Sequence, residues 1–222
     1  MRHLVILLVL SLSATAFADK IGDLSARINH ATDVLNKAVA QPDMSIPTNL
    51  LKQATCVAVF PEIVKAGFIV GARHGDGVVS CRTGAGWSEP AFVSISGGSF
   101  GFQIGVQVSE RILVFVEPDA MKRFDQNTVT LGGDLSVAAG PVGRDAAAAV
   151  DTKNGTGVYA YSSNKGLFAG VSLDGSVMTI EDSDNDIAYG QRMGHSAILS
   201  SPLTNPTFIV KPFVDTLNTI AP

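Results

Sequence analysis

The sequence predicts an α+β fold: one domain built on a mainly antiparallel β-sheet, open or closed into a barrel, with helices from both ends of the chain packed on it. Three observations carry this prediction. The 22 glycines and the 7% aromatic share indicate close strand contacts and tight turns rather than a helical bundle. Beyond residue 56 the apolar residues recur at every second position, whereas both ends of the chain show helical spacing. No linker or charge block divides the 222 residues, of which 46% are hydrophobic.

The N-terminal segment 1–18 has the organisation of a secretory signal peptide. A basic start precedes a short apolar run, and Ala16-Phe17-Ala18 places small residues before the expected cut. The run is too short to span a bilayer. The alternative to a signal peptide is a buried N-terminal strand or helix. We therefore expect a mature domain of residues 19–222, exported to the periplasm or secreted, and soluble after cleavage.

Residues 19–40 are expected to form an amphipathic helix, because their apolar positions step by three and four residues along one face. This apolar face has two interpretations. It packs on the core of its own domain, or it inserts into a lipid headgroup layer. The residues that would contact lipid in the second case are Lys20, Ile21, Leu24, Arg27 and Ile28. On that interpretation Leu24→Asp abolishes vesicle binding and leaves the fold intact.

The middle of the chain is expected to be a series of strands. Short helices are expected at 47–54 and 119–124, and longer ones at 182–193 and 212–220. The sequence His74-Gly75-Asp76-Gly77 is typical of a hairpin turn. Because no long helix separates the strands, apart from an Ala-rich stretch at 146–149, the sheet should be mainly antiparallel. The expected strands are 56–60, 67–73, 78–82, 91–96, 99–108, 112–117, 135–140, 157–162, 167–173 and 176–180.

Cys56 and Cys81 are the two cysteines, and both lie in strand-like segments. In an oxidising compartment they would form a disulfide, and the alternative is a pair of buried thiols in the sheet. Two cysteines with scattered histidines have no metal-ligand spacing, so no metal is expected.

Two motifs suggest chemistry but lack the required context. Gly97-Gly98-Ser99-Phe100-Gly101 matches a hydrolase nucleophile elbow, yet the residues after it alternate like a strand instead of a helix. Asp182, Asp184 and Asp186 alternate as in a calcium loop, but Ile187 replaces the glycine of the sharp turn. These carboxylates should instead begin a helix. With 16 basic and 20 acidic residues, the chain is also a poor nucleic-acid ligand, and we expect neither enzymatic activity nor a cofactor.

A set of motifs resembles the SYLF domain family, in order from about residue 46 to 190. Those motifs are Cys56-Val57-Ala58-Val59-Phe60-Pro61, Lys65-Ala66-Gly67-Phe68-Ile69-Val70-Gly71, Trp87-Ser88-Glu89-Pro90-Ala91-Phe92, Gly98-Ser99-Phe100-Gly101-Phe102-Gln103-Ile104-Gly105, Ser136-Val137-Ala138-Ala139-Gly140-Pro141-Val142-Gly143-Arg144, Tyr161-Ser162 and Lys165-Gly166-Leu167-Phe168-Ala169-Gly170-Val171-Ser172-Leu173-Asp174-Gly175.

The resemblance implies a non-enzymatic lipid-binding module. Eukaryotic members of the family bind phosphoinositides and some bind actin, while exported bacterial members are described as lipid-binding. We therefore expect a phospholipid or membrane surface as the partner, through the N-terminal helix or an apolar groove of the β core, and no actin, because an exported protein would not meet it. The place of Lys65, Arg144 and Lys165 in the motifs makes them further candidate contacts. The alternative is a structural or protein-interaction module of the cell envelope.

Overall fold

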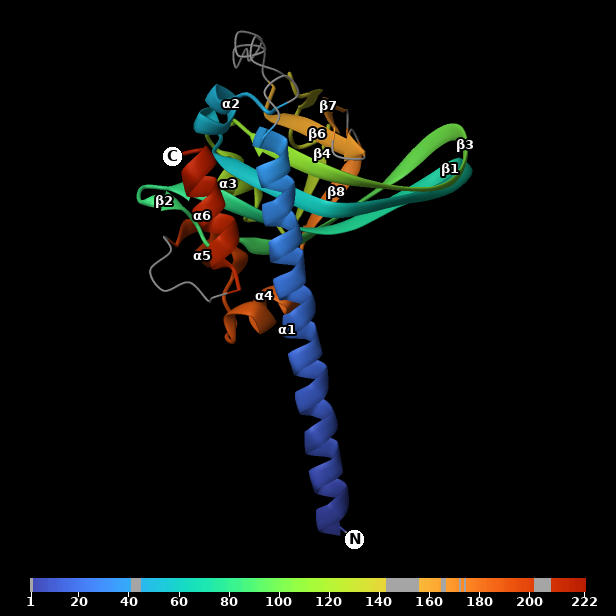
Figure 1. The fold of residues 1–222 in the computed structure, drawn as a ribbon, viewed down its shortest axis with the longest axis vertical. Coiled ribbons are helices and arrows are strands. Elements are labelled where there is room, and N and C mark those ends of the chain that lie inside the picture. The colour runs from blue at the N-terminus through green and yellow to red at the C-terminus, as the bar shows by residue number, and fades with distance from the viewer. Residues whose placement is uncertain are drawn as a thin grey trace.

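The computed structural model describes residues 2–40, 45–142, 156–164, 167–171, 173, 175–201 and 209–222, with side chains described from Asp19 onward except at 68–69, 99–104, 164 and 167. One sheet and the helices around it make a single α+β domain (Figure 1). The elements are α1 (Arg2–Ala40), α2 (Thr48–Gln53), β1 (Cys56–Thr83), β2 (Gly86–Trp87), β3 (Ala91–Phe115), α3 (Ala120–Arg123), β4 (Thr128–Leu131), β5 (Val137–Ala139), β6 (Val158–Asn164), β7 (Leu167–Gly170), β8 (Ser176–Ile180), α4 (Asp182–Tyr189), α5 (His195–Ser200) and α6 (Lys211–Ile220).

The centre of the sheet is a long antiparallel pair, β1 and β3, that doubles back on itself. The register runs from Cys56 opposite Phe115 to Val79 opposite Ala91. The two ends of β1 nevertheless lie side by side, because a disulfide joins Cys56 to Cys81 and Arg82 N donates a hydrogen bond to Thr55 O at 2.7 Å. The folded-back middle of both strands projects from the body of the domain (Figure 1).

The shorter strands extend the sheet on both sides of this pair. β6 pairs with the end of β3 and carries β5 and β7, while β8 pairs with the start of β3 and carries β4. Among the pairings between two described strands, β5 with β6 is parallel and the others are antiparallel, and an isolated bridge between Leu131 and Leu135 is also parallel. The predicted mainly antiparallel sheet is thus confirmed, and it curls into a half-barrel.

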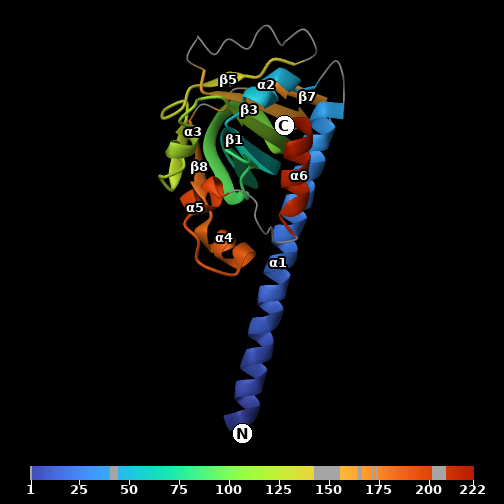
Figure 2. The same ribbon diagram turned by 90° about the vertical axis from the view of Figure 1, so that its left-hand side faces the viewer.

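Each face of the curled sheet has its own hydrophobic core. Successive residues of a strand point to opposite faces, so Val57 and Val59 pack on one side and Ala58 and Phe60 on the other. Helices α1, α2 and α6 cover the first face, as Figure 2 shows from the side, while α3 and α5 contribute to the second. The N-terminal half of α1 extends away from the sheet (Figures 1 and 2). Within the described residues, no helix combines the length and apolarity needed to cross a membrane.

The predicted hairpin turn at residues 74–77 is wrong, because these residues are paired within β1 opposite residues 93–96 of β3. The glycines there serve close packing instead of chain reversal. A Cβ atom at Gly77 would lie 2.4 Å from Val59 O, and one at Gly75 would lie 2.4 Å from Glu62 O. Glycine is required where one strand approaches another this closely.

The predicted helix at 182–193 is shorter than expected and is followed by a separate one. α4 ends at Tyr189, where Gly190 takes the left-handed conformation with φ of 65° that commonly terminates a helix. The predicted helices at 47–54, 119–124 and 212–220 correspond to α2, α3 and α6. The Ala-rich stretch at 146–149 lies outside the described residues.

Candidate functional site

The apolar face of residues 19–40 is packed against the sheet. Leu24 and Ile28 are fully buried in the core cluster that α1 shares with β1 and α6, while Ile21 is half-buried. The structure therefore follows the core-packing interpretation for Leu24 and Ile28. As long as α1 stays packed, these two side chains are not available to a headgroup layer.

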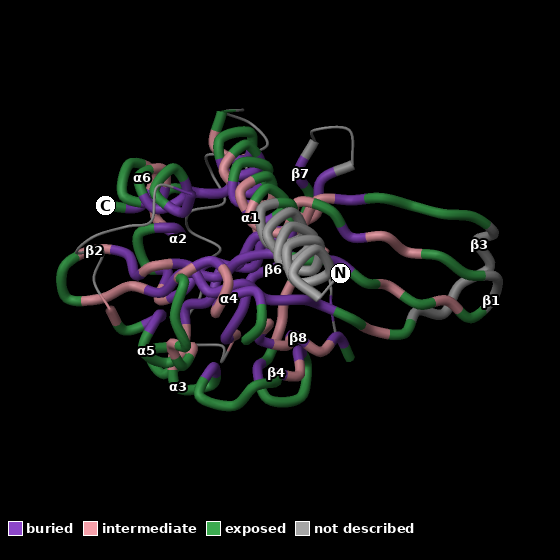
Figure 3. The backbone as a smooth tube through the Cα atoms, turned by 90° about the horizontal axis from the view of Figure 1, so that it is seen from below, coloured by how far each residue is buried: buried purple, intermediate pink, exposed green. Residues whose placement is uncertain are grey.

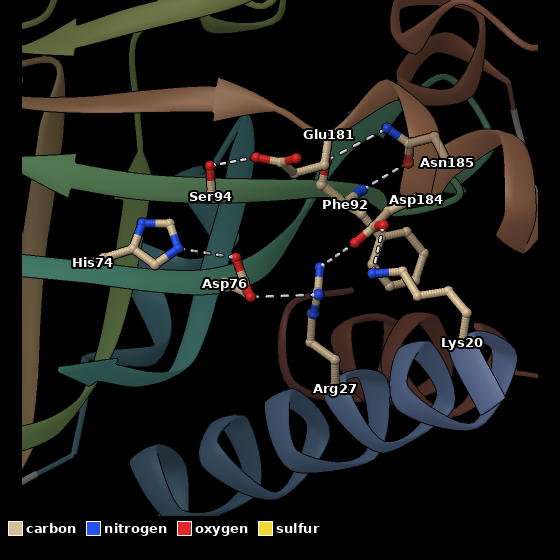
Figure 4. Close-up of polar contacts among 9 residues, drawn as sticks. All are labelled: Lys20, Arg27, His74, Asp76, Phe92, Ser94, Glu181, Asp184 and Asn185. Atoms are coloured by element: carbon tan, nitrogen blue, oxygen red, sulfur yellow. Dashed lines mark hydrogen bonds and ion pairs between the residues drawn. The ribbon is translucent and has the colours of Figure 1, made fainter. Parts of the chain in front are cut away.

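The two basic residues expected to contact lipid headgroups are paired with carboxylates of the protein itself (Figure 4). Lys20 Nζ lies 2.8 Å from Asp184 Oδ1, and Arg27 Nη1 lies 3.0 Å from Asp184 Oδ2. Arg27 also lies 3.6 Å from Asp76 Oδ2 of β1, and its guanidinium sits 5.5 Å from the centre of the Phe92 ring. These contacts fasten α1 to α4 and to the sheet.

Asp184 is positioned for this role by the way α4 begins. Three aspartates alternate at its start, where the helix dipole favours negative charge, and this part of the prediction is confirmed. Next to it, Asn185 Oδ1 accepts a hydrogen bond from Phe92 N at 2.7 Å, which ties α4 to β3 (Figure 4). The cluster is thus a joint between helices and sheet. No group of three or more potential metal ligands occurs among the described residues.

The other candidate contacts lie in different places. Lys65 is on the projecting part of β1, opposite Gln107 of β3. Arg144 and Lys165 lie outside the described residues. Trp87 of the third motif is a core residue, because it is 2% exposed and its Nε1 donates a hydrogen bond to Ala221 O at 2.9 Å. Ser99 of the elbow-like motif lies within the continuous strand β3, so the helix that an elbow requires is not there.

The projecting part of the β1–β3 pair is the most exposed region of the sheet. We define the β arm as residues 64–74 of β1 and 96–108 of β3. None of its described side chains is buried, as the exposed stretch in Figure 3 shows. The large hydrophobic residues that are exposed in the described chain all lie on it: Val70 at 61%, Val106 at 71% and Val108 at 49%.

The β arm is also free of acidic residues. It contains Lys65, Arg73 and His74 and not one aspartate or glutamate, in a chain whose net charge is −4. Just beyond it on β3 lies Arg111. Within the described residues, no carboxylate lies within ion-pair distance of Lys65, Arg73 or Arg111. Lys65 and Arg73 therefore differ from Lys20 and Arg27 of α1 in having no partner of opposite charge, whereas His74 Nε2 lies 3.6 Å from Asp76 Oδ1.

Sequence reasoning missed Arg73 and Arg111. Burial lowers the pKa of the Arg73 guanidinium. The pKa of Arg111 is lowered first by burial and then by the positive charge of Arg73. A usable signal for Arg73 was present, since residues 63–75 and 95–109 are two acid-free stretches and the first of them carries basic residues at strand positions.

Comparison with known proteins identifies the family of this domain. A family model described as "Ysc84: Las17-binding protein actin regulator" matches residues 96–220, which is more than half of the chain. The chain belongs to the Ysc84 family. The resemblance to the SYLF domain, which is the domain of the Ysc84 family, is thereby confirmed.

Members of the Ysc84 family from yeast and vertebrates align with most of this chain. LAS seventeen-binding protein 3 of Saccharomyces cerevisiae is 39% identical over 168 residues, which cover 74% of this chain and 36% of the yeast protein. SH3 domain-containing YSC84-like protein 1 of Xenopus laevis is 39% identical over 152 residues, covering 68% and 45%, and the Bos taurus protein of the same name is 36% identical over 167 residues, covering 74% and 49%. The chain thus spans less than half the length of these relatives.

The exclusion of actin made from the sequence is wrong. It rested on the expected export of the chain, whereas the family model is described as "Las17-binding protein actin regulator" and a yeast relative is named LAS seventeen-binding protein 3. Actin and its regulators therefore return to the set of candidate partners.

Proposed function

We propose that this member of the Ysc84 family is a non-enzymatic module that binds phospholipid membranes through the β arm. The observation that carries the proposal is the coincidence of two properties in one projecting element. The exposed large hydrophobic side chains of the described chain lie there, and so do cations without acidic partners. Monomeric proteins rarely expose grouped apolar residues unless they serve binding.

The two faces of the arm suit an interface between water and lipid. By alternation from the buried residues Ile112 and Val114, Val106 and Val108 lie on the same face of the sheet as α1. Lys65 lies on the opposite face, since it is opposite Gln107 while its neighbour Val64 is opposite Val108. An apolar face enters the boundary between headgroups and acyl chains, and each cation near an anionic surface contributes about 1 kcal/mol.

The net negative charge of the chain does not prevent this binding. Charges more than a Debye length away, about 8–10 Å at physiological salt, are largely screened. The arm projects from the body (Figure 3), and it carries Lys65 and Arg73 but no acidic residue, so a membrane that approaches the arm meets a region without carboxylates. The arm thus replaces the packed helix face as the best-supported contact, and Lys65 is retained from the original set.

Vesicle flotation tests the proposal. The full chain is mixed with phosphatidylcholine vesicles, with or without phosphatidylserine as a minor component, at low and high salt. We expect wild-type protein to float with the anionic vesicles, and the Val106→Asp/Val108→Asp variant to lose at least tenfold in affinity. The matched control is Asn127→Asp, an exposed body position, which should bind like wild type. Equal binding of both variants would show that the arm is not the contact.

Binding of actin or of an actin-regulating protein is the second candidate function. It is favoured by the family description and by the name of one yeast relative, LAS seventeen-binding protein 3. Co-sedimentation with purified actin filaments, in the absence of lipid, separates the two candidates. Sedimentation with filaments that Val106→Asp/Val108→Asp does not reduce would assign actin to another surface.

Export remains a prediction. Determining the N-terminal residue of the secreted protein would test it. We expect cleavage after Ala18, which would remove the part of α1 that extends away from the sheet and keep Leu24 and Ile28 in the core (Figure 2). Recovery of the intact chain from the cytoplasm alone would contradict it.

A further inference from the structure

Part of β3 has a strand on one side only. β1 lies along one edge of β3, and on the other edge β8 pairs with residues 93–97 and β6 with residues 110–115. Among the strands that the structure describes, none pairs with that second edge between these two segments. We call residues 105–109, on the β6 side of the gap, the free edge. Its residues 105–108 are exposed.

The backbone groups of Val106 and Val108 point out of the free edge. At the other end of β3, Phe115 O accepts a hydrogen bond from Thr55 N on the β1 side. The direction of the backbone groups alternates along a strand, so odd-numbered residues of β3 face β1 and even-numbered residues face away. β3 stays regular between residues 106 and 115, because the register shift at residues 60–63 places the extra residue in β1.

The free edge lacks two features that commonly prevent another chain from pairing with an exposed strand. Natural sheets protect their edges with charged residues and prolines, among other devices. Residues 95–109 of β3 contain no charged residue and no proline. The edge instead presents two valine side chains, with Val106 71% and Val108 49% exposed. An uncharged edge with outward-facing N–H and C=O groups is a template for an extended chain.

The two faces of the β arm determine which side chains an added strand would need. Residues of that strand opposite Val106 and Val108 would share their apolar face, and the residues between them would share the face of Gln107 and Lys65. Lys65 lies one strand further in, opposite Gln107, so it would be two strand spacings, or about 10 Å, from the added backbone. The extended side chains of a lysine and a glutamate together span this distance.

We propose that the free edge binds an extended, acidic segment of a partner protein, which adds to the sheet as a further strand. The segment alternates apolar residues, which pack on Val106 and Val108, with acidic residues, which face Lys65. Backbone hydrogen bonds supply affinity in this mode of recognition, and the alternate side chains supply specificity. An acidic segment complements an arm that has basic residues and no aspartate or glutamate. The site does not rest on the proposed membrane function, because a lipid has no strand to pair with these backbone groups.

A capped heptapeptide of alternating glutamate and valine tests the pairing, with binding to the full chain measured by fluorescence anisotropy. In a strand paired with Val106 and Val108, the N–H groups of the peptide's valines point toward the protein and those of its glutamates point away. N-methylation removes a backbone donor and leaves the side chains unchanged. We expect N-methylation of the valines to weaken binding at least tenfold, and N-methylation of the glutamates to change it less than twofold. Equal effects of the two modifications, or no binding of the unmodified peptide, would overturn the proposal.

A peptide with lysine in place of glutamate tests the charge of the partner. We expect it to bind at least tenfold more weakly than the glutamate peptide, and the difference should shrink as salt is raised. Lys65→Gln should bind the glutamate peptide about threefold more weakly than wild type. The matched control is Lys52→Gln, an exposed position of α2, which should bind like wild type. Equal binding of the lysine and glutamate peptides would overturn the acidic partner.

Residue-resolved hydrogen exchange locates the added strand. The amides of Val106 and Val108 should exchange at least tenfold more slowly when the glutamate peptide is bound, whereas that of Gln107, which faces β1, should change little. Protection of both valine amides before peptide is added, together with a dimer in sedimentation, would assign the edge to a second copy of the chain and overturn the proposal.

Vesicle flotation separates this site from the membrane function. A chain that floats with anionic vesicles but binds no peptide loses the strand site and keeps the membrane function. A chain that binds the glutamate peptide with the expected N-methyl pattern but does not float keeps the strand site and loses the membrane function.

Discussion

The cations of α1 and the cations of the β arm are the same residue types in opposite situations. Lys20 and Arg27 are held by Asp184, and Arg27 also faces Asp76. Arg73 of the arm and Arg111 just beyond it have no carboxylate within ion-pair distance among the described residues, and each leaves a buried Nε–H without an acceptor. A basic residue next to an apolar stripe is therefore weak evidence for a lipid contact. Under the proposed function, the cations that contact lipid are those whose charge the fold leaves unmatched.

Leu24→Asp gives the largest expected effect and tests whether α1 belongs to the body. Leu24 is fully buried, so the variant loses its packing and buries a carboxylate without a partner. We expect a loss of about 4 kcal/mol or more in the free energy of unfolding, measured by urea denaturation. This replaces the expectation from the sequence that the variant would keep its fold.

The control for this variant is Ala26→Asp, which lies on the exposed side of the same helix and should cost little. A stable, folded Leu24→Asp protein would show that α1 separates easily from the sheet. In that case the apolar face of the helix would again be a candidate for lipid contact, and the contrast between helix and arm would fail.

Removal of the disulfide tests whether the body end of β1 is held more firmly than the arm. Cys56 and Cys81 are fully buried, and the bond between them closes a loop with a sequence separation of 25 residues. We expect Cys56→Ala/Cys81→Ala to lower the free energy of unfolding by roughly 3 kcal/mol in the chain-entropy model. In hydrogen exchange, protection should fall in the body and stay low in the arm. Equal protection of arm and body before the substitution would contradict the comparison.

The sequence predicted the positions of helices and strands better than it predicted which segments pair with one another. Residues 19–40, the start of α4 and most strands follow from local periodicity, and they were found where expected. The doubling back of β1 was missed, because glycines at residues 75 and 77 fit a tight turn as well as a close approach of two strands. The two possibilities are distinguished only by the position of Val59 and Glu62, whose carbonyl oxygens face these glycines. That position depends on how the chain folds back and is not visible in the local sequence.

The same limit applied to the candidate site. Leu24 and Ile28 have the spacing of a membrane-binding stripe and of a core-facing stripe, since both need one apolar face. Asp184, which pairs with Lys20 and Arg27, belongs to a helix near the opposite end of the chain, so local spacing could not reveal the pairing. The acid-free composition of the arm was readable in the sequence, but its projection from the body was not.

Asp184→Asn should have a smaller effect and tests the cations of α1, whose charges are paired. Arg27 and Asp184 are both nearly buried, so removing the carboxylate charge leaves Arg27 with only the 3.6 Å contact to Asp76 and leaves Lys20 without a partner. We expect a loss of about 2 kcal/mol in the free energy of unfolding. Asp215→Asn, which removes the exposed partner of Lys211, should change it by less than about 0.5 kcal/mol. Equal effects of the two variants would show that burial of the α1 pair adds nothing.

Arg111→Gln has the smallest expected effect, and its sign is opposite to that of Asp184→Asn. The variant removes one of two repelling guanidiniums, so the protein should become more stable. The gain should be about 1 kcal/mol or less, which corresponds to ~2 °C in Tm for a domain of this size. Thermal unfolding in chloride buffer measures it, with Arg192→Gln as the neutral control. The gain should shrink as salt is raised, because salt screens the repulsion. If Arg111→Gln instead destabilises the protein as much as Asp184→Asn does, the fold provides Arg111 with a partner and the two sets of cations do not differ.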